Sequence, residues 1–182
     1  PEEIETNLKK LIKSEEVYGL VHVAAPPLNP KSIEELDNHI ELEKHLKVGP
    51  LAFHQILQGL IPQMKEGGSI IAILTQYIFN TPPAKTSSYT SAKMATLGIV
   101  KSVAAEYGSR GIRCNSVSPS MINTKYTENL PMKIKQIEAA NNPLRRLCEP
   151  EEVADVVFYL LSPKSSFING INLPVTGGVT MN

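Results

Sequence analysis

The segment Ser69-Ile70-Ile71-Ala72-Ile73-Leu74 decides the fold class of this chain. It is a short unbroken apolar run, which is typical of a strand buried on both faces of a sheet. Three more runs have the same character: Val17–Ala25, Ile112–Val117 and Ile171–Val175. Helical patterns lie between the runs, and this alternation predicts a parallel sheet covered on both faces. We therefore expect an α/β fold with a doubly wound sheet of about four strands.

The expected helices begin at capping signals or carry apolar residues at helical spacing. They fall at residues 1–12, from Ser32, at 51–64, at 88–107 and from Pro150. Gly67-Gly68 is interpreted as the turn that ends the helix 51–64. Residues 119–142 are expected to form an excursion with one or two short helices.

Composition and charge exclude several classes of protein. The 182 residues are 42% hydrophobic and 20% charged, which is ordinary for a globular chain. The formal net charge is zero, so nothing electrostatic indicates nucleic acid or an anionic membrane as partner. No apolar run approaches the roughly 20 residues that span a bilayer, and no signal peptide is visible. We expect one domain, residues 1–182, in the cytoplasm, with Cys114 and Cys148 as buried reduced thiols.

The residues that carry chemistry begin with Tyr89 and Lys93 at the start of the helix 88–107. Residues four apart lie one turn apart on the same helix face, so Lys93 is expected beneath Tyr89. A nearby ammonium favours the phenolate and lowers the phenol pKa from its usual value of about 10. Tyr89 would then exchange a proton with a substrate hydroxyl or carbonyl. The same spacing also fits two unrelated surface residues on one helix.

The sequence around Tyr89 and Lys93 favours a catalytic pair over two unrelated surface residues. Thr75 follows the apolar run Ser69–Leu74, at the strand end where ligands bind in a doubly wound sheet. Its hydroxyl is placed to hydrogen-bond a substrate oxygen, although a turn residue is the simpler alternative. The segment Ile112-Arg113-Cys114-Asn115-Ser116-Val117-Ser118-Pro119 leads a second strand into a loop on the same side.

The order of these motifs resembles the short-chain dehydrogenase/reductase family, and within it most closely the 3-oxoacyl-acyl-carrier-protein reductases. The similarity continues through Pro150-Glu-Glu-Val-Ala and Val175-Thr-Gly-Gly and covers essentially the whole chain. It implies a partial Rossmann-like fold and an NAD(P)-dependent oxidoreductase that acts on a carbonyl/alcohol pair. It also implies a homodimer or homotetramer that uses a small or carrier-borne carbonyl substrate.

The resemblance assigns a role to each matching residue. Tyr89 is the general acid/base, Lys93 tunes it and binds the nicotinamide ribose, and Thr75 stands at the position of the catalytic Ser. The segment that contacts the nicotinamide and phosphates is matched by Pro119, Ile122 and Thr124. Residues 123–142 match the lid over the substrate. The resemblance also implies a two-fold helical interface, for which we expect the surplus apolar or small residues Ala52, Phe53, Leu57, Met94, Leu97 and Gly98.

Several positions depart from the family pattern. His22-Val23-Ala24-Ala25 replaces Asn-Asn-Ala-Gly, and Gly49, followed by Pro50, replaces the Asn of the catalytic tetrad. Ser120 stands for a glycine, and Thr176 stands for an aspartate. Thr75 keeps the hydroxyl of Ser but adds a methyl group that stiffens χ1.

The largest departure is the glycine-rich turn that cradles the pyrophosphate in this family. No Gly-x-x-x-Gly-x-Gly occurs in the 182 residues. We therefore expect this chain alone to bind NAD or NADP weakly or not at all. We also expect a symmetry mate or another segment to cover the outer edge of the strand Val17–Ala25.

Two alternatives stay open from the sequence. A halohydrin dehalogenase-like enzyme would use Ser, Tyr and Arg without a nicotinamide, and Lys93 stands where that group has Arg. A catalytically degenerate domain kept for assembly fits the departures at Gly49 and at the glycine-rich turn. A metal site is not expected, because His22, His39, His45 and His54 show no grouping with Cys or acidic residues.

Overall fold

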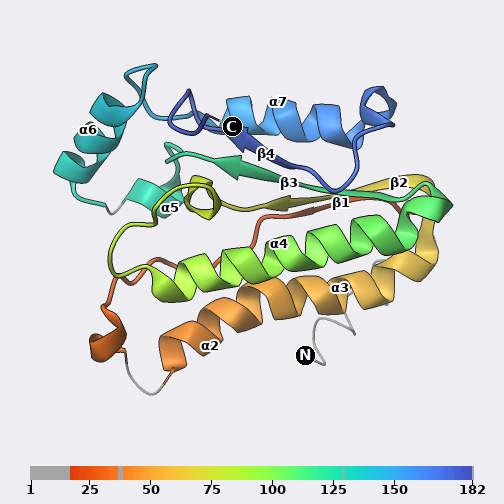
Figure 1. Cartoon of the computed structure of the whole chain (residues 1–182), viewed down its shortest axis with the longest axis horizontal. Coiled ribbons are helices and arrows are strands. Elements are labelled where there is room, and N and C mark those ends of the chain that lie inside the picture. The colour runs from red at the N-terminus through yellow and green to blue at the C-terminus, as the bar shows by residue number, and fades with distance from the viewer. Residues whose placement is uncertain (1–16, 37–38, 129, 182) are drawn as a thin grey trace.

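The computed structural model describes residues 17–36, 39–128 and 130–181, which are built around one parallel sheet. Its strands are β1 (Val17–His22), β2 (Met64–Ile73), β3 (Arg113–Pro119) and β4 (Asn172–Val175), in the order β1-β2-β3-β4. Every neighbouring pair is parallel, so the carboxyl ends of all four strands meet at one edge, to which the arrowheads point in Figure 1. The predicted α/β fold class is confirmed.

Helices cover both faces of this sheet. On one face lie α2 (Ile40–Leu46), α3 (Ala52–Leu60) and α4 (Ser87–Tyr107), and on the other lies α7 (Pro150–Leu161) (Figure 1). Successive strand residues point to opposite faces. Ile70 therefore packs in the core under α3 and α4, whereas Ile71 packs in the core under α7. The burial on both faces explains why these strands appear in the sequence as continuous apolar runs.

Short elements complete the described chain. The excursion after β3 holds α5 (Lys125–Glu128) and α6 (Met132–Asn141), as predicted. The other elements are η1 (Ile33–Glu35), η2 (Lys47–Leu51), η3 (Ile61–Gln63), η4 (Gln76–Ile78), η5 (Gly108–Arg110) and η6 (Pro163–Ser165). None of the helices in the described parts of the chain has the length and apolar character needed to cross a membrane.

The strand boundaries correct two predictions. β1 ends at His22, so the predicted run to Ala25 is too long. β2 begins at Met64, and Gly67-Gly68 lies inside it rather than in a turn. The register with β1 shifts at this point, and Gly67 has a φ of 81°. A Cβ on Gly68 would meet the Tyr18 carbonyl oxygen at 3.1 Å, so the glycine allows β1 to approach a bulged strand.

The helix boundaries differ at two places as well. The expected helix 51–64 is three elements, because a π segment (η2) that contains Pro50 precedes α3 and a 3₁₀ turn (η3) follows it. The capping box at Ser32 forms, but it closes only the short turn η1, and α2 begins at Ile40. The helices 88–107 and from Pro150 are confirmed. The expected helix at residues 1–12 lies outside the described residues.

Candidate active site

The candidate site lies at the carboxyl edge of the sheet, over the ends of β2 and β1. Thr75 lies two residues after the end of β2 and is only 4% exposed, and Tyr89 lies in the first turn of α4. In the parallel sheet, the loop after β2 and the start of α4 come together at this edge. The tertiary structure thus brings Thr75, Tyr89 and Lys93 to one place.

Lys93 is held in position by the backbone of β2. Its Nζ donates a hydrogen bond of 2.8 Å to the carbonyl oxygen of Ile73, the last residue of that strand. The same Nζ lies 5.7 Å from the centroid of the Tyr89 ring. The i,i+4 prediction is therefore confirmed in its geometry, with the ammonium beneath the ring.

The electrostatics of the pair differ from the expectation. Burial raises the pKa of Tyr89, and hydrogen bonding from Thr75 opposes this effect only in part. Burial also lowers the pKa of Lys93 to about 8. The expected depression of the phenol pKa is wrong for the chain without a ligand, because desolvation outweighs the stabilisation of the phenolate. Tyr89 is consequently a protonated donor at neutral pH.

A hollow of about 280 Å³, which includes its solvent-open part, lies beside this pair. Its lining includes Tyr89, Lys93, Gly49 and two histidines, His22 and His45. In the sequence, His22 stood out only as a departure from the Asn-Asn-Ala-Gly motif and neither histidine was expected beside Tyr89. A signal existed for His22, because it follows an apolar run at a strand end. No such signal marked His45, which lies within a helix.

Both histidines are buried and carry lowered pKa values. His22 stacks on Phe53 with ring centroids 4.8 Å apart, and burial followed by the charge of Lys93 lowers its pKa to about 4. His45 meets the Tyr89 ring edge-on at 6.0 Å. Its Nε2 lies 3.3 Å from a carboxylate oxygen of Glu41, and burial lowers its pKa against the effect of that carboxylate. Both imidazoles are therefore neutral at pH 7.

The residues expected to contact a cofactor lie on the neighbouring strand end. Pro119 is the last residue of β3, and Ile122 forms an isolated bridge with Cys148. The Thr124 backbone N–H donates to the Thr127 hydroxyl at 3.2 Å. None of the three lines the hollow beside Tyr89. They share the carboxyl edge with the Tyr89 cluster but belong to the loop that leaves β3.

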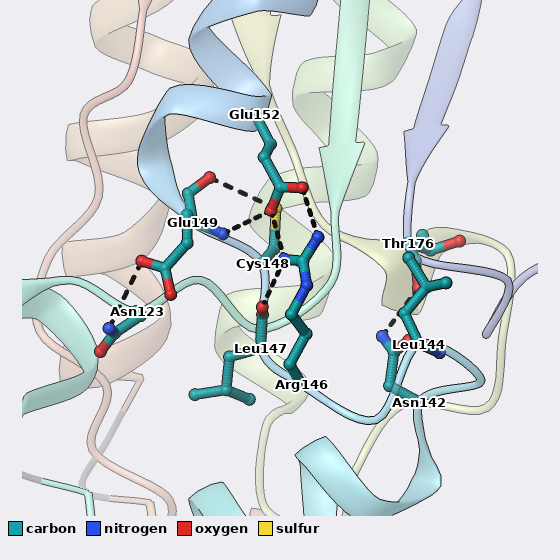
Figure 2. A network of polar contacts seen from close by, with 9 residues as sticks. All are labelled: Asn123, Asn142, Leu144, Arg146, Leu147, Cys148, Glu149, Glu152 and Thr176. Carbon is teal, nitrogen blue, oxygen red and sulfur yellow. Dashed lines mark hydrogen bonds and ion pairs between the residues drawn. The ribbon is translucent and has the colours of Figure 1, made fainter.

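The two ends of the expected lid, residues 123–142, are fixed by polar contacts that Figure 2 shows. At the first end, the side chain of Asn123 donates to Glu149 at 3.4 Å. Arg146 forms two 2.7 Å bonds with the carboxylate of Glu152, which also accepts from the Glu149 backbone N–H at 2.9 Å. This carboxylate thus ties the segment after the lid to the start of α7.

The second end of the lid is fastened to the loop after β4. The Asn142 side chain donates to the carbonyl oxygen of Thr176 at 3.0 Å and accepts from the Leu144 backbone N–H at 2.9 Å. Gly177 has no space for a side chain, since a Cβ there would come within 2.5 Å of the Asn142 Oδ1. The helix α6 between these anchors has no buried residue.

The two cysteines lie apart from the Tyr89 hollow. Cys114 and Cys148 are both buried and free, and burial raises the pKa of the Cys114 thiol to about 12. Within residues 17–36, 39–128 and 130–181, no three His, Cys, Asp or Glu side chains gather closely enough to hold a metal ion.

Comparisons with known proteins agree with this architecture. The family model described as Enoyl-(Acyl carrier protein) reductase matches residues 1–180. A 3-oxoacyl-acyl-carrier-protein reductase of Buchnera aphidicola is 33% identical over 177 residues, which cover 93% of this chain and 72% of that protein. The (3R)-3-hydroxyacyl-CoA dehydrogenase of Mus musculus is 42% identical over 95 residues, 52% of this chain and 37% of that enzyme.

Solved structures give the same result. A short chain dehydrogenase family protein from Francisella tularensis superposes with a TM-score of 0.88 at 28% identity, over 96% of this chain and 76% of that one. A blue fluorescent protein from a metagenomic library, solved in complex with NADPH, has a TM-score of 0.91 at 25% identity, over 100% and 72%.

A parallel doubly wound sheet with a Tyr–Lys pair over its carboxyl edge defines the class, a Rossmann-like oxidoreductase fold. The chain belongs to the short-chain dehydrogenase/reductase family and resembles its 3-oxoacyl-acyl-carrier-protein reductases. The matched part spans little more than a third (37%) of the mammalian hydroxyacyl-CoA dehydrogenases.

Proposed function

We propose that this chain carries the reaction centre of an NAD(P)-dependent oxidoreductase that interconverts a carbonyl and an alcohol. The observation that carries the proposal is the convergence of Thr75, Tyr89 and Lys93 at one strand end, with Lys93 tethered to Ile73. The relatives named as 3-oxoacyl reductase and 3-hydroxyacyl-CoA dehydrogenase favour a 3-oxoacyl or 3-hydroxyacyl group as substrate. Such a group arrives on a carrier as a thioester, so a short 3-oxoacyl thioester is the first substrate to test.

The three side chains have distinct roles in this proposal. Tyr89 donates its proton to the carbonyl oxygen in reduction and accepts it in oxidation. Thr75 donates a hydrogen bond to the same oxygen and orients it. Lys93 donates one N–H to Ile73, and its other two donors would be available to the ribose of a bound cofactor. The nicotinamide, when bound, supplies or takes the hydride.

The residues present suit the nicotinamide half of the cofactor. Pro119, Ile122, Thr124 and Lys93 are the residues that would contact it. Beside Pro119, the Ser120 Oγ is buried with no hydrogen-bond partner among the described residues, and a polar ligand group would satisfy it.

The pyrophosphate half has no glycine-rich turn in these 182 residues. The backbone N–H donors and helix dipole of that turn normally hold the phosphates. We expect weak or absent binding of NAD(H) and NADP(H) by this chain alone. Calorimetric titration with both cofactors measures it, and micromolar affinity would contradict the assignment of the nucleotide site.

Substitution of Tyr89 by Phe tests the reaction centre. The variant keeps the ring and its contacts but lacks the exchangeable proton, so turnover should fall by roughly 10²–10⁴-fold when it is measured at cofactor concentrations high enough to offset the weak binding expected of this chain. The matched control is Tyr107→Phe, at the other end of the same helix, which should leave turnover unchanged. The circular dichroism of both variants should equal that of the parent. A Tyr89→Phe protein with full turnover would contradict the proposed role of Tyr89.

We propose that the protein is a cytoplasmic homodimer or homotetramer. Large apolar side chains are exposed on two regions, with Leu51 60% and Met94 52% exposed near α3 and α4, and Phe158 76% and Phe167 102% exposed on and after α7. Phe53 and Leu57, expected at an interface, are instead buried in the core of the chain itself. Light scattering at micromolar concentration should give an oligomeric mass, and a monomer would contradict it.

A catalytically degenerate domain with an assembly role is the second candidate. Gly49 favours it, because a hydrogen atom replaces the amide that the family uses. The two candidates separate in the Tyr89→Phe experiment, since only the enzyme has turnover to lose.

A further inference from the structure

A hydrogen bond connects the expected lid to the loop that leaves β1. The Tyr126 hydroxyl of α5 donates to the carbonyl oxygen of Pro26 at 2.9 Å, although the two residues are 100 positions apart in the chain. β1 and β3 are not neighbours in the sheet, because β2 lies between them. The loops that leave these two strands start roughly 10 Å apart, which is twice the spacing of adjacent strands. The bond between the loops therefore crosses the carboxyl edge of the sheet at the position of β2.

Both partners of this bond lie beside the reaction centre. Pro26 lines the hollow together with Tyr89 and Lys93. Burial raises the pKa of Tyr126, and so does the charge that Tyr89 would carry as a phenolate. The Tyr126 hydroxyl is consequently a proton donor at neutral pH, and it lies within electrostatic reach of Tyr89. The bond thus closes the space between the two loops next to the proposed reaction centre.

Rotation of one side chain is sufficient to open this connection. On the β1 side, Pro26 and Pro27 each have a fixed φ, so the loop backbone is stiff. On the α5 side, the Thr127 hydroxyl donates to the carbonyl oxygen of Ile122 at 2.7 Å, which ties the short helix to the segment that leaves β3. The Tyr126 side chain is 40% exposed, so rotation about its own χ1 brings the hydroxyl into solvent while both backbones stay in place.

We propose that the Tyr126–Pro26 hydrogen bond is a latch that closes the reaction centre in the ligand-free chain and opens when the Tyr126 side chain turns outward. The inference rests on the proposed function, because the latch regulates access to that same site. It begins two residues after Thr124, so the group that it obstructs is the nicotinamide end of the cofactor. One hydrogen bond between uncharged groups shifts an equilibrium by roughly two- to tenfold, so the open state stays accessible. The apparent affinity of a ligand that requires the open state is reduced by the closed fraction.

The first test needs neither cofactor nor turnover. Tyr126→Phe keeps the ring and removes only the donor, so the site should be open for a larger fraction of the time. Lys93 has a pKa of about 8, so much of its amine is reactive at pH 8. Its acylation by acetic anhydride, followed residue by residue with mass spectrometry, should be roughly two- to tenfold faster in the variant than in the parent. An unchanged rate at Lys93 would overturn the proposal.

Two controls separate the latch from a general loosening of the fold. Tyr159→Phe removes a hydroxyl from the exposed surface of α7, on the other face of the sheet, and should leave the Lys93 rate unchanged. The fully buried Cys114 reports on the core, and its alkylation rate should be the same in Tyr126→Phe and in the parent. A parallel rise at Lys93 and Cys114 would show that the variant is destabilised as a whole, and it would also overturn the latch.

Cofactor titration gives the second test. Tyr126→Phe should bind NADH or NADPH roughly two- to tenfold more tightly than the parent, because no closed state competes with the ligand. Weaker binding by the variant would show that the bond builds the site instead of closing it, and would contradict the proposal. If neither protein binds a cofactor, the labelling rates decide the inference alone. Absent turnover in the parent counts against the proposed function and leaves the labelling result unaffected.

Discussion

Buried polar groups differ in their hydrogen bonding between the two ends of the sheet. Toward the amino ends of the strands, such groups are paired. Arg113 donates to the carbonyl oxygen of Leu160 at 2.9 Å, and Asn115, which is fully buried, donates to Ile168 at 2.9 Å and accepts from the Ile171 N–H at 3.0 Å. These bonds join β3 to α7 and to the turn before β4.

At the carboxyl edge, several buried polar atoms have no hydrogen-bond partner among the described residues. Among the described residues, those without a hydrogen-bond partner at or over this edge include His22 Nε2, Ser88 Oγ and Ser120 Oγ. Asn172 Nδ2 in β4 is the exception to this placement. Figure 1 shows that α2 and the start of α4 lie over the same edge.

The difference separates architecture from function. Native proteins pair nearly all buried polar groups, so unpaired ones gathered at one edge indicate a place for water or ligand. The paired end specifies the fold, because each bond there is lost when the strand moves. The edge around Tyr89 gives up stability at the place where the proposed site lies.

The largest expected effect concerns Lys93 and its burial. Its pKa of about 8 in the folded chain lies below the unfolded value of about 10.4, so the unfolded chain binds more protons between these values and stability from this group rises with pH. Lys93→Met removes the free-energy cost of burying the charged ammonium, which is about 3 kcal/mol and applies in full below pH 8. Urea unfolding at pH 7 and pH 10 should show the variant gaining relative to the parent at pH 7, with most of that gain lost at pH 10. Equal differences at both pH values would contradict the burial of the ammonium.

A smaller effect, this time a loss of stability, is expected at the end of the sheet where the buried polar groups are paired. Asn115→Ala leaves the Ile168 carbonyl and the Ile171 N–H buried without their partner, which costs about 2–3 kcal/mol. Denaturant unfolding at one pH measures the change.

The smallest effect is expected for the matched change at the carboxyl edge. Ser120→Ala removes a hydroxyl that has no partner among the described residues, so stability should stay within about 0.5 kcal/mol of the parent. A cost as large as that of Asn115→Ala would abolish the contrast between the two ends.

Particular residues show how far the sequence predicts this protein. The strand cores, the helices 88–107 and 150–161, and the placement of Lys93 beneath Tyr89 followed from local patterns. The role of Gly67-Gly68 did not, because a turn and a bulge use the same glycine conformations. The direction of the Tyr89 pKa shift was also missed, since burial depends on neighbours that are remote in sequence.

The sequence by itself determined the order of strands and helices, the family and the residues of the Tyr89–Lys93 pair, because periodicity and motif spacing are local properties of the chain. Only the tertiary structure decided that Lys93 is tethered to Ile73 and that His22 and His45 line the hollow beside Tyr89. It alone also decided which buried polar atoms lack partners. These facts depend on packing between segments far apart in the chain, where burial and distance set the energies of charges and hydrogen bonds.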